Sequence, residues 1–477
     1  MDRQLPREHR VRSIRQLVDE WDLTELYDVY AGVGSEAYPP DLLLKVVLLE
    51  MLEGRPSPAQ WFRDLHDSLP LRWLAMGITP SRTALYDFRD RAGKVIQSLN
   101  AQLIRRAHSQ GFIDGQVEVQ DGTAIRACAS RHRLVNAETL ARRITALQEA
   151  VLQDKSGMPV ERPGWMARTP GGRLAQADRY GRAQEILIER LARNAKRRKD
   201  KRLSENKVMV SLSDPEAALG RDKEKVFGPC YTAQFVVDRG SLLIVASHVA
   251  AQATDAGMLP VMLDQRCEVL GGPPRKQVAD AGYVSILDLQ ECAKRGVELI
   301  APFQENDFTA RKRAQKPKTM LGKEAFTWLP HEQTYACPQG HRLKHLNRQR
   351  LTRREETTLL QTQYRCPPEH CQTCPIHLQC CRNPQTGRTI KRIDGEELLD
   401  EHRQRMATPE ALELRRLRGS IIERTFADAK RHRGLHRLHG RGLRRAQTEV
   451  HLVVLAINLL RLIKLRKTAH NSNADSS

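Results

Sequence analysis

The sequence predicts an α/β protein in which helices flank a mixed sheet, with a helical N-terminal domain and inserted subdomains. Three observations predict this class. Short helix-forming segments fill residues 1–110, strand-like alternation begins at Gln116, and residues 275–303 have the pattern of a strand, a helix and a second strand. Because a strand–helix–strand crossover joins parallel strands, the sheet is expected to have a parallel component.

Proline and glycine divide the first 110 residues into short helices. Pro39 and Pro40 precede the apolar run LLLKVVLLEML, which Gly54 can close, and Ser57-Pro58 begins the next helix. A third segment reads ALYDFRDRAG. We expect a compact helical domain over residues 1–110 that binds DNA through one of its helices. A plain bundle with a solvated basic face is the alternative.

A sheet domain is expected over residues 111–467. In QVEVQDGTAIRA, Val117, Val119 and Asp121 alternate as in a half-buried strand, which would place Asp121 at the strand's end. Helical spacing then predicts a helical insertion near residues 131–205. Strand patterns return in YTAQFVVD and LLIVASHV, which a turn at residues 238–240 can join.

The crossover unit places a second acid at a strand end. Residues 277–280 form the first strand, Ser285 and Asp288 can form a capping box, and Gly296 can end the helix. Asp280 therefore follows a strand where α/β sheets collect ligands. A Cys-rich insertion is expected near residues 331–395, and the polar tail at residues 468–477 is expected to be disordered.

The charge balance points to a polyanionic partner. Of the 477 residues, 78 are Lys or Arg and 57 are Asp or Glu, so the formal net charge is +21. Basic residues cluster at 193–202, 311–318 and 431–445. Such clusters bind polyanions through counterion release, and nucleic acid is the leading candidate. With 40% hydrophobic and 28% charged residues and no long apolar segment, we expect an intracellular globular protein with no membrane partner.

Three acids stand out as candidate site residues, namely Asp121, Asp280 and Glu423. Taken singly, the two aspartates fit turn residues and the glutamate fits a solvated helix face. In SIIERTFADAK, however, Ile422 belongs to an apolar stripe, and Glu423 shares the neighbouring face with Lys430. A carboxylate and an ammonium group would then point the same way.

The segments that carry these acids, VQDGTAIRA, VADAGYVS and IIERTFADAKRHRG, resemble the catalytic core of bacterial insertion-sequence transposases of the DDE type. The resemblance extends to the N-terminal helices, the strand FGPCYTAQFVVD, the Cys-rich insertion and the block from ERTFADAK to AINLLRL. It implies a ribonuclease-H-like fold. It also implies that Asp121, Asp280 and Glu423 are the catalytic acids.

The resemblance implies a DNA-processing enzyme. The family cleaves DNA strands and transfers its own insertion element, using two Mg²⁺ ions, with Mn²⁺ as a substitute. Carboxylates suit these hard cations, and a metal pair stabilises both the attacking and the leaving oxygen of a phosphodiester. The implied partner is double-stranded DNA, comprising terminal inverted repeats and target DNA. We expect a homo-oligomer on DNA in the bacterial cytoplasm, associated with the nucleoid.

The same resemblance suggests phosphate-binding residues. Lys430 matches the lysine that follows the third acid in related enzymes, and Arg418 and Arg431 are the neighbouring candidates for DNA phosphate contacts. The sequence departs from the family upstream, where ALELRRLR stands in place of the usual tyrosine. Asp255 is the alternative second acid should Asp280 not serve.

The cysteines of the insertion suggest a metal site. Cys371, Cys374 and Cys380, with Cys337 upstream, have a spacing compatible with tetrahedral zinc. Unligated, reduced cysteines are equally compatible with the sequence. Other side chains nearby could replace a ligand: Cys366, Cys381, His341, His370 and His377.

Two other functional classes remain open on sequence alone. One is a catalytically inactive or domesticated DNA-binding protein derived from such a transposase. The other is a zinc-dependent nucleic-acid-binding module whose acids only balance charge. The intact acidic triple favours the enzyme over both.

Overall fold

The computed structural model describes residues 1–30, 38–197, 199–222, 224–303, 321–352 and 358–474. The chain forms two compact units. The first comprises Met1–Val278 and Arg416–Ser477, and the second comprises Ala279–Arg415. The N-terminal helices thus belong to the same unit as most of the sheet. The basic cluster predicted at residues 311–318 lies outside the described residues.

The N-terminal helices form as the proline and glycine pattern predicts. The central one, α3 (Pro40–Leu52), is buried along almost its whole length and begins at the predicted proline pair. It packs against its neighbours and against the C-terminal helix, so the N-terminal core is shared with the end of the chain. The other helices are α1 (Arg10–Asp19), α2 (Thr24–Asp28), α4 (Pro58–Asp67), α5 (Leu69–Leu74), α6 (Arg82–Ala92) and α7 (Ile96–Ser109).

The sheet of the first unit is mixed. Strand β1 (Val117–Arg126) pairs with β5 (Phe227–Asp238) in antiparallel fashion and with β7 (Lys276–Val278) in parallel. The strand order is β4 (Ala218–Arg221), β5, β1, β7, and β6 (Ile244–Ala250) also pairs with β5. The predicted α/β class with flanking helices is confirmed, and the architecture is consistent with a ribonuclease-H-like fold.

Asp121 lies in the middle of β1, whereas the sequence predicted the end of a strand. The strand continues because Thr123 and Ile125 extend the buried face. Gly122 does not mark a turn. A Cβ atom at this position would collide with the side chains of Asp255 and Gln234, so the glycine allows a close approach within the sheet.

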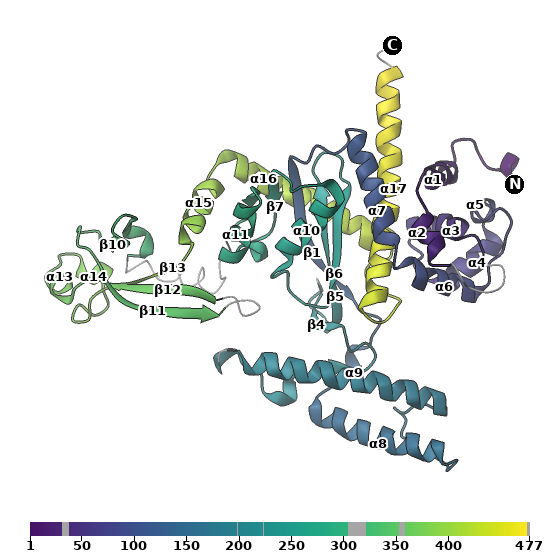
Figure 1. Ribbon diagram of the computed structural model, residues 1–477, viewed down its shortest axis with the longest axis horizontal. Helices are drawn as coiled ribbons and strands as arrows, with labels where there is room; N and C mark the ends of the chain where they lie inside the picture. Colours follow the sequence, from purple (N-terminus) through teal and green to yellow (C-terminus); the bar gives the residue numbers. More distant parts are fainter. Residues whose placement is uncertain (31–37, 198, 223, 304–320, 353–357, 475–477) are drawn as a thin grey trace. The chain divides into compact units, whose positions relative to one another are not determined.

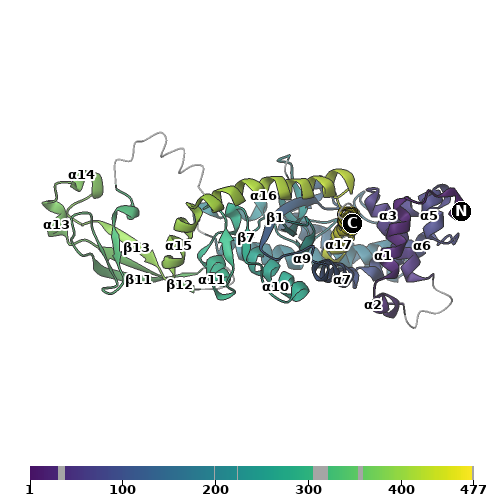
Figure 2. The same cartoon turned by 90° about the horizontal axis from the view of Figure 1, so that it is seen from above.

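Helices from two distant parts of the chain pack on the sheet. Helix α10 (Met258–Leu270) packs on β6 and β5, and α17 (Leu443–Ala474) packs on β6 and alongside α7 (Figure 1, Figure 2). Residues 468–474, predicted to be disordered, continue α17. No glycine or proline interrupts this segment, so nothing in its covalent structure ends the helix earlier.

Two long helices lie within the range in which the sequence predicts a helical insertion. They are α8 (Ala137–Lys155) and α9 (Pro170–Ala195), which pack antiparallel over a small apolar core that includes Leu140, Leu147 and Leu187 (Figure 1). Short strands β2 (Leu134–Val135) and β3 (Val210–Ser211) pair at the base of this hairpin. The hairpin therefore has its own core and a small two-stranded sheet at its base.

The second unit holds the crossover helix and the Cys-rich insertion. Helix α11 (Ile286–Lys294) begins at the predicted cap, where the amide of Asp288 donates to Ser285 Oγ at 3.3 Å. Strand β8 (Glu298–Ile300) follows. The insertion contains the antiparallel sheet β11 (Lys344–Thr352), β12 (Thr358–Arg365) and β13 (Thr389–Ile393), with β9 (Thr327–Leu329), β10 (Thr334–Ala336), α13 (Pro368–Gln372), α14 (His377–Cys380) and α15 (Glu396–Met406).

Candidate active site

Asp121 is held by an arginine that is distant in sequence. Its Oδ2 accepts a hydrogen bond from Arg418 Nη1 at 2.8 Å, and its Oδ1 accepts one from the backbone amide of Gly122 at 2.8 Å. The side chains of Asp121 and Arg418 are 21% and 24% exposed. The carboxylate is therefore paired with a positive charge while remaining within reach of solvent.

Helix α16 (Pro409–Ala427) carries Arg418 and Glu423 over the same sheet face as Asp121. Its buried Phe426 packs on Phe235 of β5, with ring centroids 5.2 Å apart. Phe235 is the register partner of Asp121, and directly opposed residues of antiparallel strands point to one face. Glu423, three residues before Phe426, is exposed. The predicted apolar stripe on this helix is confirmed, because Ile422, Phe426 and Ala429 are buried.

Lys430 is anchored to the strand of Asp121. It lies in a π-helical turn, Asp428–His432, that follows α16, and its Nζ donates to the carbonyl of Ala124 at 3.0 Å. The next residue, Arg431, is exposed. The π turn thus brings one cation onto β1 and leaves the next one open to a ligand.

Asp255, the alternative second acid, lies on the other side of the sheet. Its Oδ1 accepts a hydrogen bond from Gln234 Nε2 at 2.6 Å and lies next to Gly122. Successive residues of a strand point to opposite faces, so this position faces away from Asp121. The structure therefore gives Asp255 a packing role against Gly122.

Asp280 belongs to the second unit, whereas Asp121 and Glu423 belong to the first. It comes two residues after β7, is exposed, and caps the 3₁₀ turn Ala281–Tyr283 by accepting a hydrogen bond from the amide of Ala281. Its place just beyond the carboxyl end of a strand agrees with the sequence analysis.

Carboxylate oxygens are the ligands that Mg²⁺ prefers, so the chemistry of the acids fits a divalent cation. The guanidinium group of Arg418 also shows that the position beside Asp121 Oδ2 accommodates a positive charge. In the part of the chain that the structure describes, however, no group of three or more His, Cys, Asp or Glu side chains is arranged to hold a metal ion.

The pairing of Arg418 with Asp121 was not predicted. Arg418 was selected as a phosphate ligand because of its place before Glu423, and the structure shows that its near partner is a carboxylate. The two residues are 297 positions apart, so no local pattern in the sequence could have revealed the contact.

The cysteines of the insertion surround a small cavity of about 20 Å³. Burial, and then hydrogen bonds with Cys371 and Cys337, raise the pKa of the Cys366 thiol. The rings of His341 and His370 stack at 4.0 Å beside it. The predicted ligands Cys337, Cys371, Cys374 and Cys380 all line the cavity, and Cys366 joins them.

Comparisons with known proteins find two families that match parts of the chain. The family described as "Transposase DDE domain" matches residues 336–463, and the family described as "Transposase domain (DUF772)" matches residues 1–91. No curated protein and no solved structure matches the chain. No helix among the described residues is long and apolar enough to cross a membrane. The two family matches, at opposite ends of the chain and together with the mixed α/β sheet, support an insertion-sequence transposase of the DDE type.

Proposed function

We propose that this transposase catalyses metal-dependent DNA strand cleavage and strand transfer of its own insertion element. The observation that carries the proposal is the placement of Asp121 and Glu423 over one face of the sheet, with Arg418 paired to Asp121. The DDE family match covers Glu423. In this proposal Asp121, Asp280 and Glu423 hold two Mg²⁺ ions, for which Mn²⁺ can substitute.

The bound cations would supply Lewis-acid stabilisation of the attacking and leaving oxygens of the phosphodiester. The protein's own groups perform the positioning. Arg418 orients the carboxylate of Asp121 and lies where a phosphate that approaches this carboxylate would come within its reach. Lys430 fixes the π turn to β1, which keeps the exposed Arg431 beside the same face for a DNA phosphate.

The natural partners in this proposal are double-stranded DNA and further copies of the chain. The DNA comprises the terminal inverted repeats of the element and its target, and the copies assemble as a homo-oligomer on that DNA. The family match supports DNA binding, and the net charge of +21 favours a polyanion. Its place of action would be the bacterial cytoplasm, in association with the nucleoid.

Three single substitutions test the catalytic proposal. Asp121→Asn, Asp280→Asn and Glu423→Gln should each lower Mg²⁺-dependent strand cleavage by at least about 100-fold, because each removes a charge that stabilises the transition state. DNA binding in EDTA should be unchanged. Asp255→Asn is the matched control and should cleave like the parent. Cleavage near the parental rate by any of the three would remove that residue from the site.

We also propose that the Cys-rich insertion takes up one Zn²⁺ ion through thiolates drawn from those that line its cavity. A bound metal would cross-link and stabilise a segment whose apolar core is small. Elemental analysis of the purified protein should then find about one zinc per chain, and Cys371→Ser should lose it. Zinc-free protein with unchanged thermal stability after chelation would contradict this assignment.

A further inference from the structure

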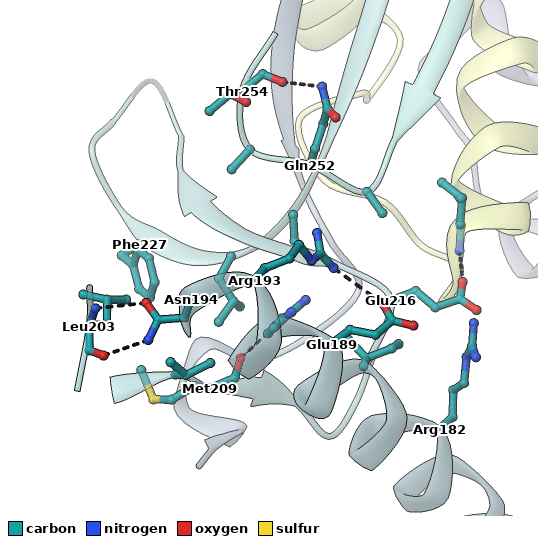
Figure 3. Close-up of a pocket in the computed structure, with 18 of the residues that line it drawn as sticks. Arg182, Glu189, Arg193, Asn194, Leu203, Met209, Glu216, Phe227, Gln252 and Thr254 are labelled. Atoms are coloured by element: carbon teal, nitrogen blue, oxygen red, sulfur yellow. Dashed lines mark hydrogen bonds and ion pairs between the residues drawn. The ribbon is translucent and has the colours of Figure 1, made fainter. Parts of the chain in front are cut away.

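The first unit contains a large open groove that the catalytic proposal does not use. Its volume is about 910 Å³. One wall is α9 of the helical insertion, and the other is formed by β4, the start of β5 and the first turn of α17 (Figure 3). The basic cluster at residues 193–202, noted in the sequence, begins in this wall.

The groove is strongly basic. Two acids, Glu189 and Glu216, line it beside six cations. Glu216 is engaged elsewhere, because its Oε2 accepts a hydrogen bond from the backbone amide of Leu443 at 2.7 Å, at the start of α17. The cations are Arg182, Arg190, Arg193, Arg197, Lys207 and Arg444.

The outer arginines are accessible to a ligand. Arg193 is 72% exposed, and its nearest acid, Glu189, lies 3.6 Å away on the same helix (Figure 3). Exposed ion pairs of this kind contribute only about 0–1 kcal/mol, so a phosphate can displace the carboxylate. Arg193 therefore offers most of its charge to an incoming polyanion.

The wall that carries these arginines is fixed in place. Arg190 donates to the carbonyl of Met209 at 2.8 Å and to that of Ala217 at 2.7 Å, which ties α9 to the segment before β4. Asn194 exchanges two hydrogen bonds with the backbone of Leu203, at 2.7 and 2.9 Å (Figure 3). The basic segment is thus folded back against α9, so its cations are pre-positioned for binding.

The groove and the candidate active site both adjoin β5, and the groove also includes residues 251–254, which lie on the side of the sheet that carries Asp255. Phe227, 45% exposed, stands in the groove at the start of this strand, and Phe235 is the register partner of Asp121. The two are eight positions apart, an even number, so their side chains point to the same side of the strand. The intervening strand is roughly 27 Å long, which is less than the roughly 34 Å of one turn of B-DNA.

We propose that this groove binds the phosphate backbone of the DNA duplex whose scissile bond lies at Asp121, less than one helical turn away. The inference rests on the proposed function for the identity of the duplex. The contacts are with phosphates, so they hold and orient the DNA without reading its sequence. The helical insertion would thereby hold the DNA near the candidate active site.

The test measures binding of a linear duplex of arbitrary sequence in EDTA, where no cleavage takes place. The variant Arg193→Gln/Arg197→Gln should weaken binding about 10-fold near physiological salt and reduce the slope of log K against log salt by about 1.8, since each phosphate contact contributes about 0.9. The control variant Arg142→Gln/Lys155→Gln removes the same charge from exposed positions of α8 outside the groove. It should change the slope by less than half as much.

A conservative variant and a folding control distinguish loss of phosphate contacts from loss of structure. Arg193→Lys/Arg197→Lys should restore most of the slope, and thermal unfolding should show that all variants fold alike. Equal slopes for the groove variant and its control would overturn the inference, as would tighter binding of a single strand than of the duplex. Because the assay needs no catalysis, Asp121→Asn should bind like the parent. Parental cleavage by Asp121→Asn with intact groove binding would contradict the catalytic proposal alone.

Discussion

Strand β1 carries two acids, Glu118 and Asp121, that meet very different surroundings. They are three positions apart, an odd number, so they point to opposite faces of the sheet. Glu118 is fully buried, and its Oε1 accepts hydrogen bonds from Arg266 on α10 at 2.8 Å. Asp121 is 21% exposed and accepts from Arg418 on α16, also at 2.8 Å. The two pairs have the same chemistry and the same length, and differ in access to water.

The difference separates a structural pair from one that can react. Burial raises the pKa of Glu118 to about 7, with the charge of Arg266 opposing the shift, so neither member of this pair can leave without stranding a charge. At Asp121 water can solvate either partner, and Arg418 can exchange the carboxylate for another anion. Solvent access therefore makes Asp121 available for chemistry and fixes Glu118 in the fold.

The largest expected effect tests the buried pair. Arg266→Met should lower the free energy of unfolding by about 3–5 kcal/mol, because it leaves Glu118 buried without its cation. Urea titration measures this. The double variant Glu118→Leu/Arg266→Met should recover most of the loss. If Arg266→Met lowered the free energy of unfolding by less than about 1 kcal/mol, burial would not make the Glu118 pair more important for stability than the Asp121 pair.

Glu50 extends the comparison to a buried acid to which no arginine binds among the described residues. It lies fully buried in α3, and burial, followed by the nearby charge of Asp64, raises its pKa from 4.5 to about 8. The unfolded chain loses this proton at lower pH than the folded chain, so stability should fall as pH rises from 4.5 to 8. Glu50→Gln should abolish that fall and stabilise the protein above this range by about 1–3 kcal/mol.

Thermal unfolding of the parent and Glu50→Gln across this pH range measures the difference between them. Asp67→Asn, at an exposed position of α4, is a control that should leave the parental pH dependence intact. The same fall with pH in Glu50→Gln would assign the effect to another group.

Arg418→Gln should have a smaller effect on stability than either buried change. Since this pair is partly exposed, the loss should be below about 1 kcal/mol and should shrink at high salt. Strand cleavage, in contrast, should fall about 10-fold or more, because Asp121 loses the group that orients it. A stability loss as large as that of Arg266→Met would break the comparison.

The smallest change is expected for Glu189→Gln in the groove. The exposed pair with Arg193 contributes little, so the free energy of unfolding should change by less than about 0.5 kcal/mol. Removing the acid should instead tighten duplex binding two- to three-fold, as measured by fluorescence anisotropy. Glu149→Gln, at an exposed position of α8 outside the groove lining, is the control and should not tighten binding.

Local patterns in the sequence predicted the local elements well. The proline start of α3, the Ser285 cap and the helical hairpin of the insertion all depend on residues close together in the chain. Gly122 misled the prediction of β1, because a glycine that admits a neighbouring side chain looks in sequence like a glycine that turns the chain. The difference depends on Asp255, more than a hundred residues later.

The candidate site was predictable only in its residue types. The resemblance selected Asp121 and Glu423, and the structure places them over one sheet face through the contact of Phe426 with Phe235. The partner of Asp121 could not be predicted, because Arg418 reaches it through the packing of α16. The groove likewise combines α9 with β4, β5 and α17, which local periodicity does not relate to one another.

The helical insertion leaves the sheet after β1 and returns through β4 to β5, the antiparallel neighbour of β1. Arg126 at the end of β1 lies opposite Cys230 near the start of β5, so the excursion is closed at its base. The helical insertion could be gained, exchanged or lost without a change in the order or pairing of the strands around Asp121. Natural variation could therefore alter the hold on the substrate while the cutting chemistry is inherited unchanged.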